Sequence, residues 1–284
     1  MSIGKPIIES WAEDILVNPK TKTPCKIQDF RSINGIIDSR VFLRNTYGFS
    51  VWLEGQDVYE TWEADGAPTH IKRENGKTIK DQVQAFQYEI DYDRPTYENF
   101  VLEGKILDVG GAAGTLRQFL PPNSKYISID PNINAPLNVT KEKAQAYTCL
   151  KNDFSFLAGM AEFLPFKEEV FDWVHMRSML DHVQIPDLAL IEAHRVLVGG
   201  GALLVGISIE GGRDGHATLK ETTKELVRKI LGKLGIDKWK DHHIWHPTFS
   251  NLKKLIESNG FTIEETYWQP KFENRVVYIK AIKS

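Results

Sequence analysis

The chain is poor in the features that mark secreted, membrane-spanning and nucleic-acid-binding proteins. Its only cysteines are Cys25 and Cys149, which make no disulfide framework and no metal motif, so a reducing cytoplasm is the expected compartment. No apolar run approaches the roughly 20 residues that cross a bilayer, and the first residues lack the apolar core of a signal peptide. A net charge of −3 gives no general basic surface for nucleic acid. The remaining composition, 42% hydrophobic and 26% charged, predicts an ordinary globular protein.

Residues 1–70 differ from the rest of the chain and predict a small β-rich accessory region. Turn signals such as Asn34-Gly35 separate short β-prone pieces at 35–38, 40–43 and 49–53. That pattern is typical of small antiparallel hairpins.

Residues 71–284 alternate between strand and helix patterns, which predicts an α/β domain with a parallel sheet and right-handed crossovers. The connection between the last two strands is too short for a helix, so these strands should pair antiparallel. We therefore expect a Rossmann-like seven-stranded sheet with helices on both faces and an antiparallel last strand. The expected strands are 105–109, 125–130, 154–158, 171–176, 202–208, 261–268 and 275–282, and the expected helices include 78–100, 112–120, 186–198, 218–234 and 248–259.

A glycine-rich turn follows the first of these strands. The segment reads Ile-Leu-Asp-Val-Gly-Gly-Ala-Ala-Gly, so the strand ends in Asp108-x-Gly110-x-Ala112-x-Gly114. A turn with few side chains lets a ligand approach the backbone, and a helix N-terminus beyond it offers free N–H groups. This predicts a nucleoside cofactor. A dinucleotide enzyme would need G-x-G-x-x-G, which Gly110, Gly111 and Gly114 fit poorly.

Three further segments follow in order. The strand 126–130 ends in Asp130-Pro131, where a carboxylate can accept both hydroxyls of a ribose, although a helix N-cap is the alternative. The next segment reads Gly-Met-Ala-Glu-Phe-Leu-Pro-Phe over 159–166. The last is an apolar strand from 171 that leads through Met-Arg-Ser to Leu-Asp-His-Val at 180–183.

Together the four segments resemble the class I S-adenosylmethionine-dependent methyltransferases, and the third is similar to the branch that includes the ubiquinone/menaquinone methyltransferases. The resemblance covers residues 78–284 and implies S-adenosylmethionine as the cofactor. Ala112, Met160 and Asp181 depart from the family pattern; Met160 stands where a side-chain acceptor for the adenine amine is usual. The cofactor-binding residues that the resemblance implies are Asp108, Gly110, Gly111, Ala112, Gly114, Asp130, Pro131, Met160, Ala161, Glu162, Met176 and Arg177.

Candidate catalytic residues are His182, Asp181 and His243. An oxygen or nitrogen acceptor can require a base, and histidine has a suitable pKa for that role. The alternative is that His182 only shapes the pocket, and His175 is expected to be structural.

The insertion 209–247 is expected to cap the substrate pocket. Its His242, His243 and His246 lack the i, i+4 helical pairing of common zinc sites, so no metal site is predicted. Two interpretations of this loop are left: it forms the rim of the substrate pocket, or it is a plain surface loop. We expect this loop and His182 to converge to within a helix diameter, roughly 10–12 Å.

The expected function is methyl transfer to an oxygen or nitrogen of a small molecule, sugar or lipid-linked precursor, with neither a nucleic-acid partner nor a membrane span. The alternatives are a non-catalytic cofactor-binding or scaffold module of the same fold and, less favoured, a nucleotide-dependent oxidoreductase. Residues 14–24 resemble the start of zinc-ribbon-like domains found with some methyltransferases, with Asn18 in a cysteine position. The N-terminal region would then be a metal-free relic, a surface for a homodimer or partner, or simply an extension packed on the main domain.

Overall fold

The computed structural model describes residues 2–46, 49–65, 79–214, 223, 227, 243–269 and 275–284. The strands are β1 Pro6–Ile7, β2 Arg31–Ile33, β3 Ile36–Asp38, β4 Lys105–Val109, β5 Lys125–Asp130, β6 Phe154–Ala158, β7 Phe171–Arg177, β8 Leu197–Ser208, β9 Phe261–Trp268 and β10 Val276–Lys283. The α-helices are α1 Ser10–Glu13, α2 Phe49–Asp65, α3 Gln82–Asn99, α4 Lys141–Ala146, α5 Pro186–Val196 and α7 Phe249–Ser258. Short 3-10 turns are η1 Ile27–Asp29, η2 Thr115–Gln118, η3 Thr148–Lys151, η4 Ala161–Phe163 and η5 Gly212–Asp214.

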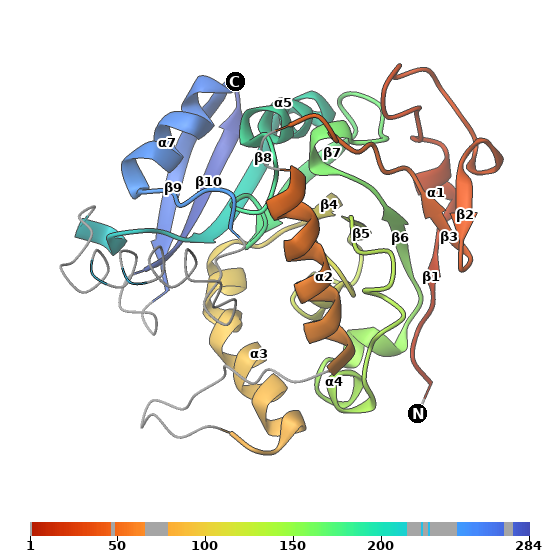
Figure 1. Cartoon of the computed structure of the whole chain (residues 1–284), viewed down its shortest axis with the longest axis horizontal. Helices are drawn as coiled ribbons and strands as arrows, with labels where there is room; N and C mark the ends of the chain where they lie inside the picture. Colours follow the sequence, from red (N-terminus) through yellow and green to blue (C-terminus); the bar gives the residue numbers. More distant parts are fainter. Residues whose placement is uncertain are drawn as a thin grey trace.

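One mixed sheet forms the centre of the molecule (Figure 1). Its order is β2-β3-β6-β5-β4-β7-β8-β10-β9, and β1 pairs with β6 outside this path. The neighbouring strands β6, β5, β4, β7 and β8 run parallel to one another, whereas β10 is antiparallel to both β8 and β9. The predicted Rossmann-like sheet with its antiparallel last strand is therefore confirmed.

Successive residues of a strand point to opposite faces of the sheet. Both faces therefore carry apolar side chains, and helices cover both. On one face, Leu107 and Leu203 belong to the same apolar cluster as residues of α5 and α7. On the other face, Ile106 and Leu204 cluster with Tyr97 of α3. The central strands are buried on both sides and consequently read as continuous apolar runs.

Three of the predicted elements are wrong: the helix at 112–120 and the β-prone pieces at 40–43 and 49–53. Residues 112–120 form only the 3-10 turn η2, because Ala112 and Gly114 have left-handed φ angles of 44° and 74° and Pro121-Pro122 follow closely. Residues 49–53 begin helix α2 instead of a strand. There Phe49 and Trp52, spaced i, i+3, stack with ring centroids 5.9 Å apart, a helical contact that outweighs the β propensity of the run.

The N-terminal residues extend the central sheet. Asn34 and Gly35 take φ angles of 53° and 80° and turn β2 into β3, as expected for an Asn-Gly hairpin. β3 then pairs in parallel with β6, and β1 pairs with β6 as well. Residues 40–43, expected to be β-prone, form no strand.

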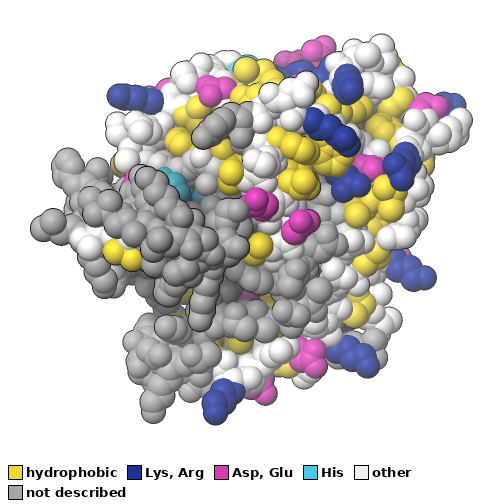
Figure 2. Space-filling view, in the orientation of Figure 1, with side chains coloured by type: hydrophobic (Ala, Val, Ile, Leu, Met, Phe, Trp, Pro, Cys, Tyr) yellow, Lys and Arg dark blue, Asp and Glu magenta, His cyan; other side chains and the backbone are white. Residues whose placement is uncertain are grey.

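Charged side chains of both signs are interspersed over the described part of the face in Figure 2, in keeping with a net charge of −3. Within the described residues, no helix combines the length and apolarity needed to span a membrane. Most of the insertion 209–247, including the expected helix at 218–234 and His242, lies outside the described residues.

Candidate functional site

The predicted site residues follow strands that end along one edge of the sheet. In the strand register Val109 at the end of β4 pairs with Ile129 of β5 and Met176 of β7, and Asp130 pairs with Ala158 of β6. The strand order reverses between β4 and β7, and open α/β sheets bind ligands outside the carboxyl ends of their strands at such a reversal.

The turn after β4 packs too tightly for side chains at Gly110 and Gly111. Gly110 has a φ of 73°, and its N–H donates to the Ile129 carbonyl at 2.8 Å. A Cβ on Gly110 would lie 2.7 Å from the Cβ of Met179, and one on Gly111 would lie 2.4 Å from Asp108 Oδ2. Larger residues at these two positions would therefore displace the turn.

Ala112 occupies a strained backbone position in this turn, with a φ of 44°. We expect Ala112→Gly to raise the free energy of unfolding by about 0.5–1 kcal/mol, because relief of the left-handed strain outweighs the flexibility that glycine adds to the unfolded chain. Urea denaturation measures the change. The matched control is Ala113→Gly at a neighbour with negative φ, which should destabilise the protein. If both variants lose stability alike, Ala112 is not strained.

Asp108 joins three strands through a buried polar chain. Its Oδ1 accepts a hydrogen bond from Nδ1 of His175 at 2.7 Å, and its Oδ2 accepts one from the Tyr126 hydroxyl at 2.6 Å. His175 Nε2 in turn faces the Tyr97 hydroxyl at 3.2 Å. Asp108 and His175 are only 3% and 2% exposed. The structural role expected for His175 agrees with this geometry, whereas the hydrogen bond between Asp108 and Tyr126 could not be predicted from the sequence.

Asp130 connects the end of β5 to the glycine turn. Its Oδ2 accepts a hydrogen bond from the N–H of Ala112 at 3.1 Å, and its Oδ1 accepts one from the N–H of Asn132 at 2.8 Å. The carbonyl of Pro131 accepts a hydrogen bond from Arg40 at 3.1 Å, and Arg40 forms an ion pair with Asp38 at the end of β3. The N-terminal region thus reaches the expected ribose edge, a contribution that the sequence did not reveal.

The segment from Met160 to Phe166 is largely buried, and hydrogen bonds hold it on two sides. Met160, Ala161 and Glu162 are each at most 5% exposed. Glu162 Oε1 accepts the N–H groups of Gln184 and Ile185 at 2.9 and 3.4 Å. Burial raises the pKa of Glu162, although these hydrogen bonds favour its charged form. Glu162 therefore fixes the loop before α5, and any contribution to cofactor binding would come through the position of the segment.

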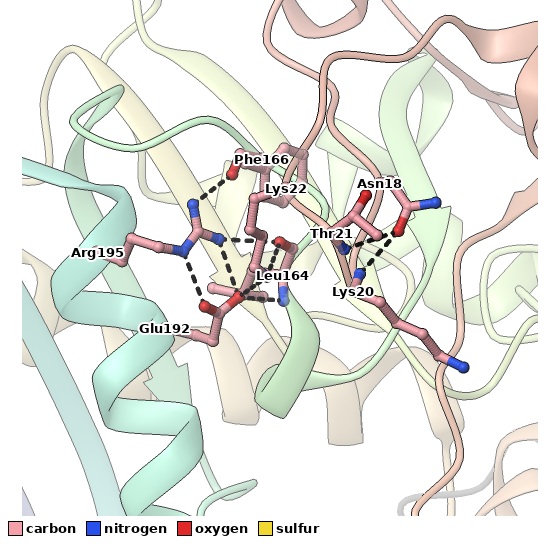
Figure 3. A network of polar contacts seen from close by, with 8 residues as sticks. All are labelled: Asn18, Lys20, Thr21, Lys22, Leu164, Phe166, Glu192 and Arg195. Atoms are coloured by element: carbon pink, nitrogen blue, oxygen red, sulfur yellow. Dashed lines mark hydrogen bonds and ion pairs between the residues drawn. The ribbon is translucent and has the colours of Figure 1, made fainter.

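A polar network holds the other side of this segment (Figure 3). Arg195 of α5 donates to the carbonyls of Leu164 and Phe166 at 3.0 and 2.7 Å and binds Glu192. Glu192 Oε2 accepts from the N–H of Leu164 at 2.8 Å and from Lys22 Nζ at 2.5 Å. Lys22 lies in the segment 14–24, so this segment packs directly on the main domain.

Arg177 at the end of β7 forms an ion pair with a buried aspartate. Its guanidinium donates to Asp93 of α3 at 2.8 Å, and Asp93 also accepts a hydrogen bond from Gln269 at 3.2 Å. Asp93 is fully buried, so this arrangement fixes α3 against the end of β7. Met176, the preceding residue, is 1% exposed and packs within the core.

Asp181, His182 and His243 come together beyond the end of β7. The rings of His182 and His243 stack with centroids 4.5 Å apart, well inside the separation expected for these segments. Asp181 Oδ1 lies 3.7 Å from His182 Nε2, and Asp181 Oδ2 lies 3.5 Å from His243 Nε2. The Asp181 carbonyl accepts the N–H groups of Ile244 and Trp245 at 2.8 and 3.3 Å, which holds the two segments together.

Comparison with known proteins gives matches in sequence and in fold. Residues 107–205 match the model of a family described as a methyltransferase domain. A ubiquinone/menaquinone biosynthesis C-methyltransferase of Shewanella sp. strain W3-18-1 is 28% identical over 170 residues, which cover 55% of this chain and 66% of that protein, just under two thirds of its length.

Two solved structures share the fold. An S-adenosylmethionine-dependent methyltransferase from Thermotoga maritima has a TM-score of 0.50 at 19% identity, and the match covers 84% of this chain and 100% of that one. The [4+2]-cyclase SpnF has a TM-score of 0.54 at 16% identity, with coverage of 86% and 98%. At such identities the likeness concerns the fold alone, and the same fold accompanies different chemistry in the two proteins.

Proposed function

We propose that this chain is a class I S-adenosylmethionine-dependent methyltransferase, and that it transfers the methyl group of S-adenosylmethionine to an oxygen or nitrogen of a small molecule. One observation carries the proposal. The glycine turn follows β4, the Asp181–His182–His243 cluster follows β7, and these strands are neighbours in the sheet. A cofactor on the turn and an acceptor at the cluster would therefore meet at the reversal of strand order.

The residues at this edge fit the chemical groups of the cofactor. Gly110 and Gly111 have no side chains that could stand between the turn and a ligand, so the carboxylate of the methionine moiety can approach the backbone there. Asp130 presents two carboxylate oxygens at the end of β5, and the two hydroxyls of a ribose need acceptors of this kind. Met160 and Ala161 offer an apolar border for adenine.

The protein would contribute mainly position and water exclusion. Bound S-adenosylmethionine would supply an already activated methyl group for transfer to the acceptor atom. Asp108 and its partners hold the turn, and Arg177 with Asp93 holds the end of β7, so the two halves of the site keep a fixed separation. The proton of an oxygen or nitrogen acceptor would leave toward the Asp181–His182–His243 cluster.

Calorimetry with S-adenosylhomocysteine and a labelled-methyl screen test this proposal. We expect the purified protein to bind S-adenosylhomocysteine with measurable heat and a raised melting temperature. We also expect labelled methyl transfer to at least one acceptor in a panel of polar aromatic compounds, sugars and lipid-linked precursors. Absence of both heat and thermal shift would refute the cofactor. Binding without transfer to any compound would instead favour a non-catalytic cofactor-binding module.

A further inference from the structure

We propose that Asp181, His182 and His243 bind a divalent transition-metal ion of the zinc class. One side-chain atom from each residue lies within 4.8 Å of the others. The three residues come from two segments, one after β7 and one before α7. Because the Asp181 carbonyl binds the N–H groups of Ile244 and Trp245, the backbone itself brings the two segments into register.

The distances within the cluster suit ligands around an ion better than direct hydrogen bonds. The two carboxylate-to-imidazole distances are 3.5 and 3.7 Å, beyond the range of about 2.7–3.2 Å for a good N–H···O bond. Metal–ligand bonds of about 2.1 Å in a tetrahedral site separate neighbouring ligand atoms by about 3.4 Å. An ion could therefore lie between these atoms after only small side-chain rotations.

Asp181 supplies a second observation. Its side chain is only 9% exposed, and its Oδ1 is buried without a hydrogen-bond partner among the described residues. A buried carboxylate oxygen that accepts no hydrogen bond costs free energy, and a bound cation would offset that cost. Asp181 was one of the departures from the family pattern, and a metal ligand gives this departure a chemical reason.

The chemical types of the three ligands indicate which metal ion the site would bind. Two imidazoles and one carboxylate are typical of zinc and of other first-row transition metals, whereas magnesium and calcium prefer oxygen ligands. The sequence argument against a metal considered only the histidines of the loop, which lack helical pairing. Asp181 and His182, which lie outside that loop, supply the missing ligands.

Three protein ligands leave a position open for a further ligand. If the proposed methyl transfer holds, a hydroxyl of the acceptor could coordinate there, and the ion would lower its pKa and favour the alkoxide or phenolate nucleophile. This consequence rests on the proposed function. The metal site itself does not, because binding of the ion can be measured without any transfer.

The test uses the full chain, freed of metal with a chelator and dialysed. We expect one Zn²⁺ per chain by calorimetry, and visible absorption typical of protein-bound Co²⁺ on titration with that ion. His182→Ala and His243→Ala should each weaken Zn²⁺ binding at least about tenfold. His194→Ala, on α5 against Phe261, is the matched control and should leave binding unchanged.

Two outcomes would overturn the metal site. One is the absence of stoichiometric Zn²⁺ and Co²⁺ binding by the intact protein, which needs no variant. The other is binding that persists unchanged in His243→Ala, a variant expected to fold because this side chain is 41% exposed. S-adenosylhomocysteine binding measured on the same metal-free protein separates the two proposals, since its retention without metal binding would refute the metal site alone.

Discussion

Replacing Asp108 by alanine is expected to lower the free energy of unfolding by about 3–5 kcal/mol, a large part of the 5–15 kcal/mol that stabilises a typical domain. The loss arises because the buried His175 ring and Tyr126 hydroxyl would both lose their acceptor, and neither can reach water. Denaturant unfolding followed by circular dichroism measures the change.

The control for Asp108 is another aspartate that accepts a backbone hydrogen bond in the sheet. Asp172 accepts one from the N–H of Lys105 at 2.7 Å but lies exposed at the opposite end of the strands. We expect Asp172→Ala to cost only about 1 kcal/mol. If Asp108→Ala cost no more than that, the polar chain would not stabilise the fold, and a direct contact of Asp108 with the cofactor ammonium would become the better account of this residue.

Replacing Asp130 by alanine is expected to weaken S-adenosylhomocysteine binding about 10- to 150-fold. A hydrogen bond to a charged group contributes about 1.5–3 kcal/mol, and every 1.4 kcal/mol corresponds to a factor of ten in affinity. The variant also removes the acceptor of the Ala112 N–H, so part of the loss would come from a looser glycine turn. Calorimetry at matched fraction folded measures the affinity.

Two further variants help to explain the weaker S-adenosylhomocysteine binding expected for Asp130→Ala. Asp130→Asn keeps one oxygen acceptor but removes the charge, so it should bind with intermediate affinity. Asp153→Ala removes an exposed aspartate that accepts the N–H of Lys5, and it should leave the affinity unchanged. Equal dissociation constants for the wild type and Asp130→Ala would contradict the ribose assignment.

The strands could be predicted because their pattern is local. β4, β5, β6 and β9 match the expected ranges residue for residue, since strands bounded by turns and buried in a sheet leave a clear apolar run. The failures at 49–53 and 112–120 have different causes. In the first, a run of β-prone residues packs as a helix, and in the second, left-handed backbone angles prevent a helix that the composition favours.

The site could be predicted only in part, since its motifs are local but its contacts are not. The order of motifs placed Asp130 and the glycine turn at the carboxyl edge of the sheet. The hydrogen bond between Asp108 and Tyr126 joins two strands, and the contact of Asp181 with His243 joins segments on either side of the insertion. A single sequence carries no signal for such pairings, because each residue alone is compatible with a surface position.

The pairing of the N-terminal strands with β6 determines where this chain can be divided. Without residues 1–38, the apolar and fully buried strand β6 would become the outer strand of the sheet, with a row of backbone groups left for any other chain to pair with. Cutting near residue 70 on the basis of composition would therefore yield an aggregation-prone fragment rather than a stable domain. A transplant of residues 71–284 into another protein would have to include the N-terminal strands that pair with β6.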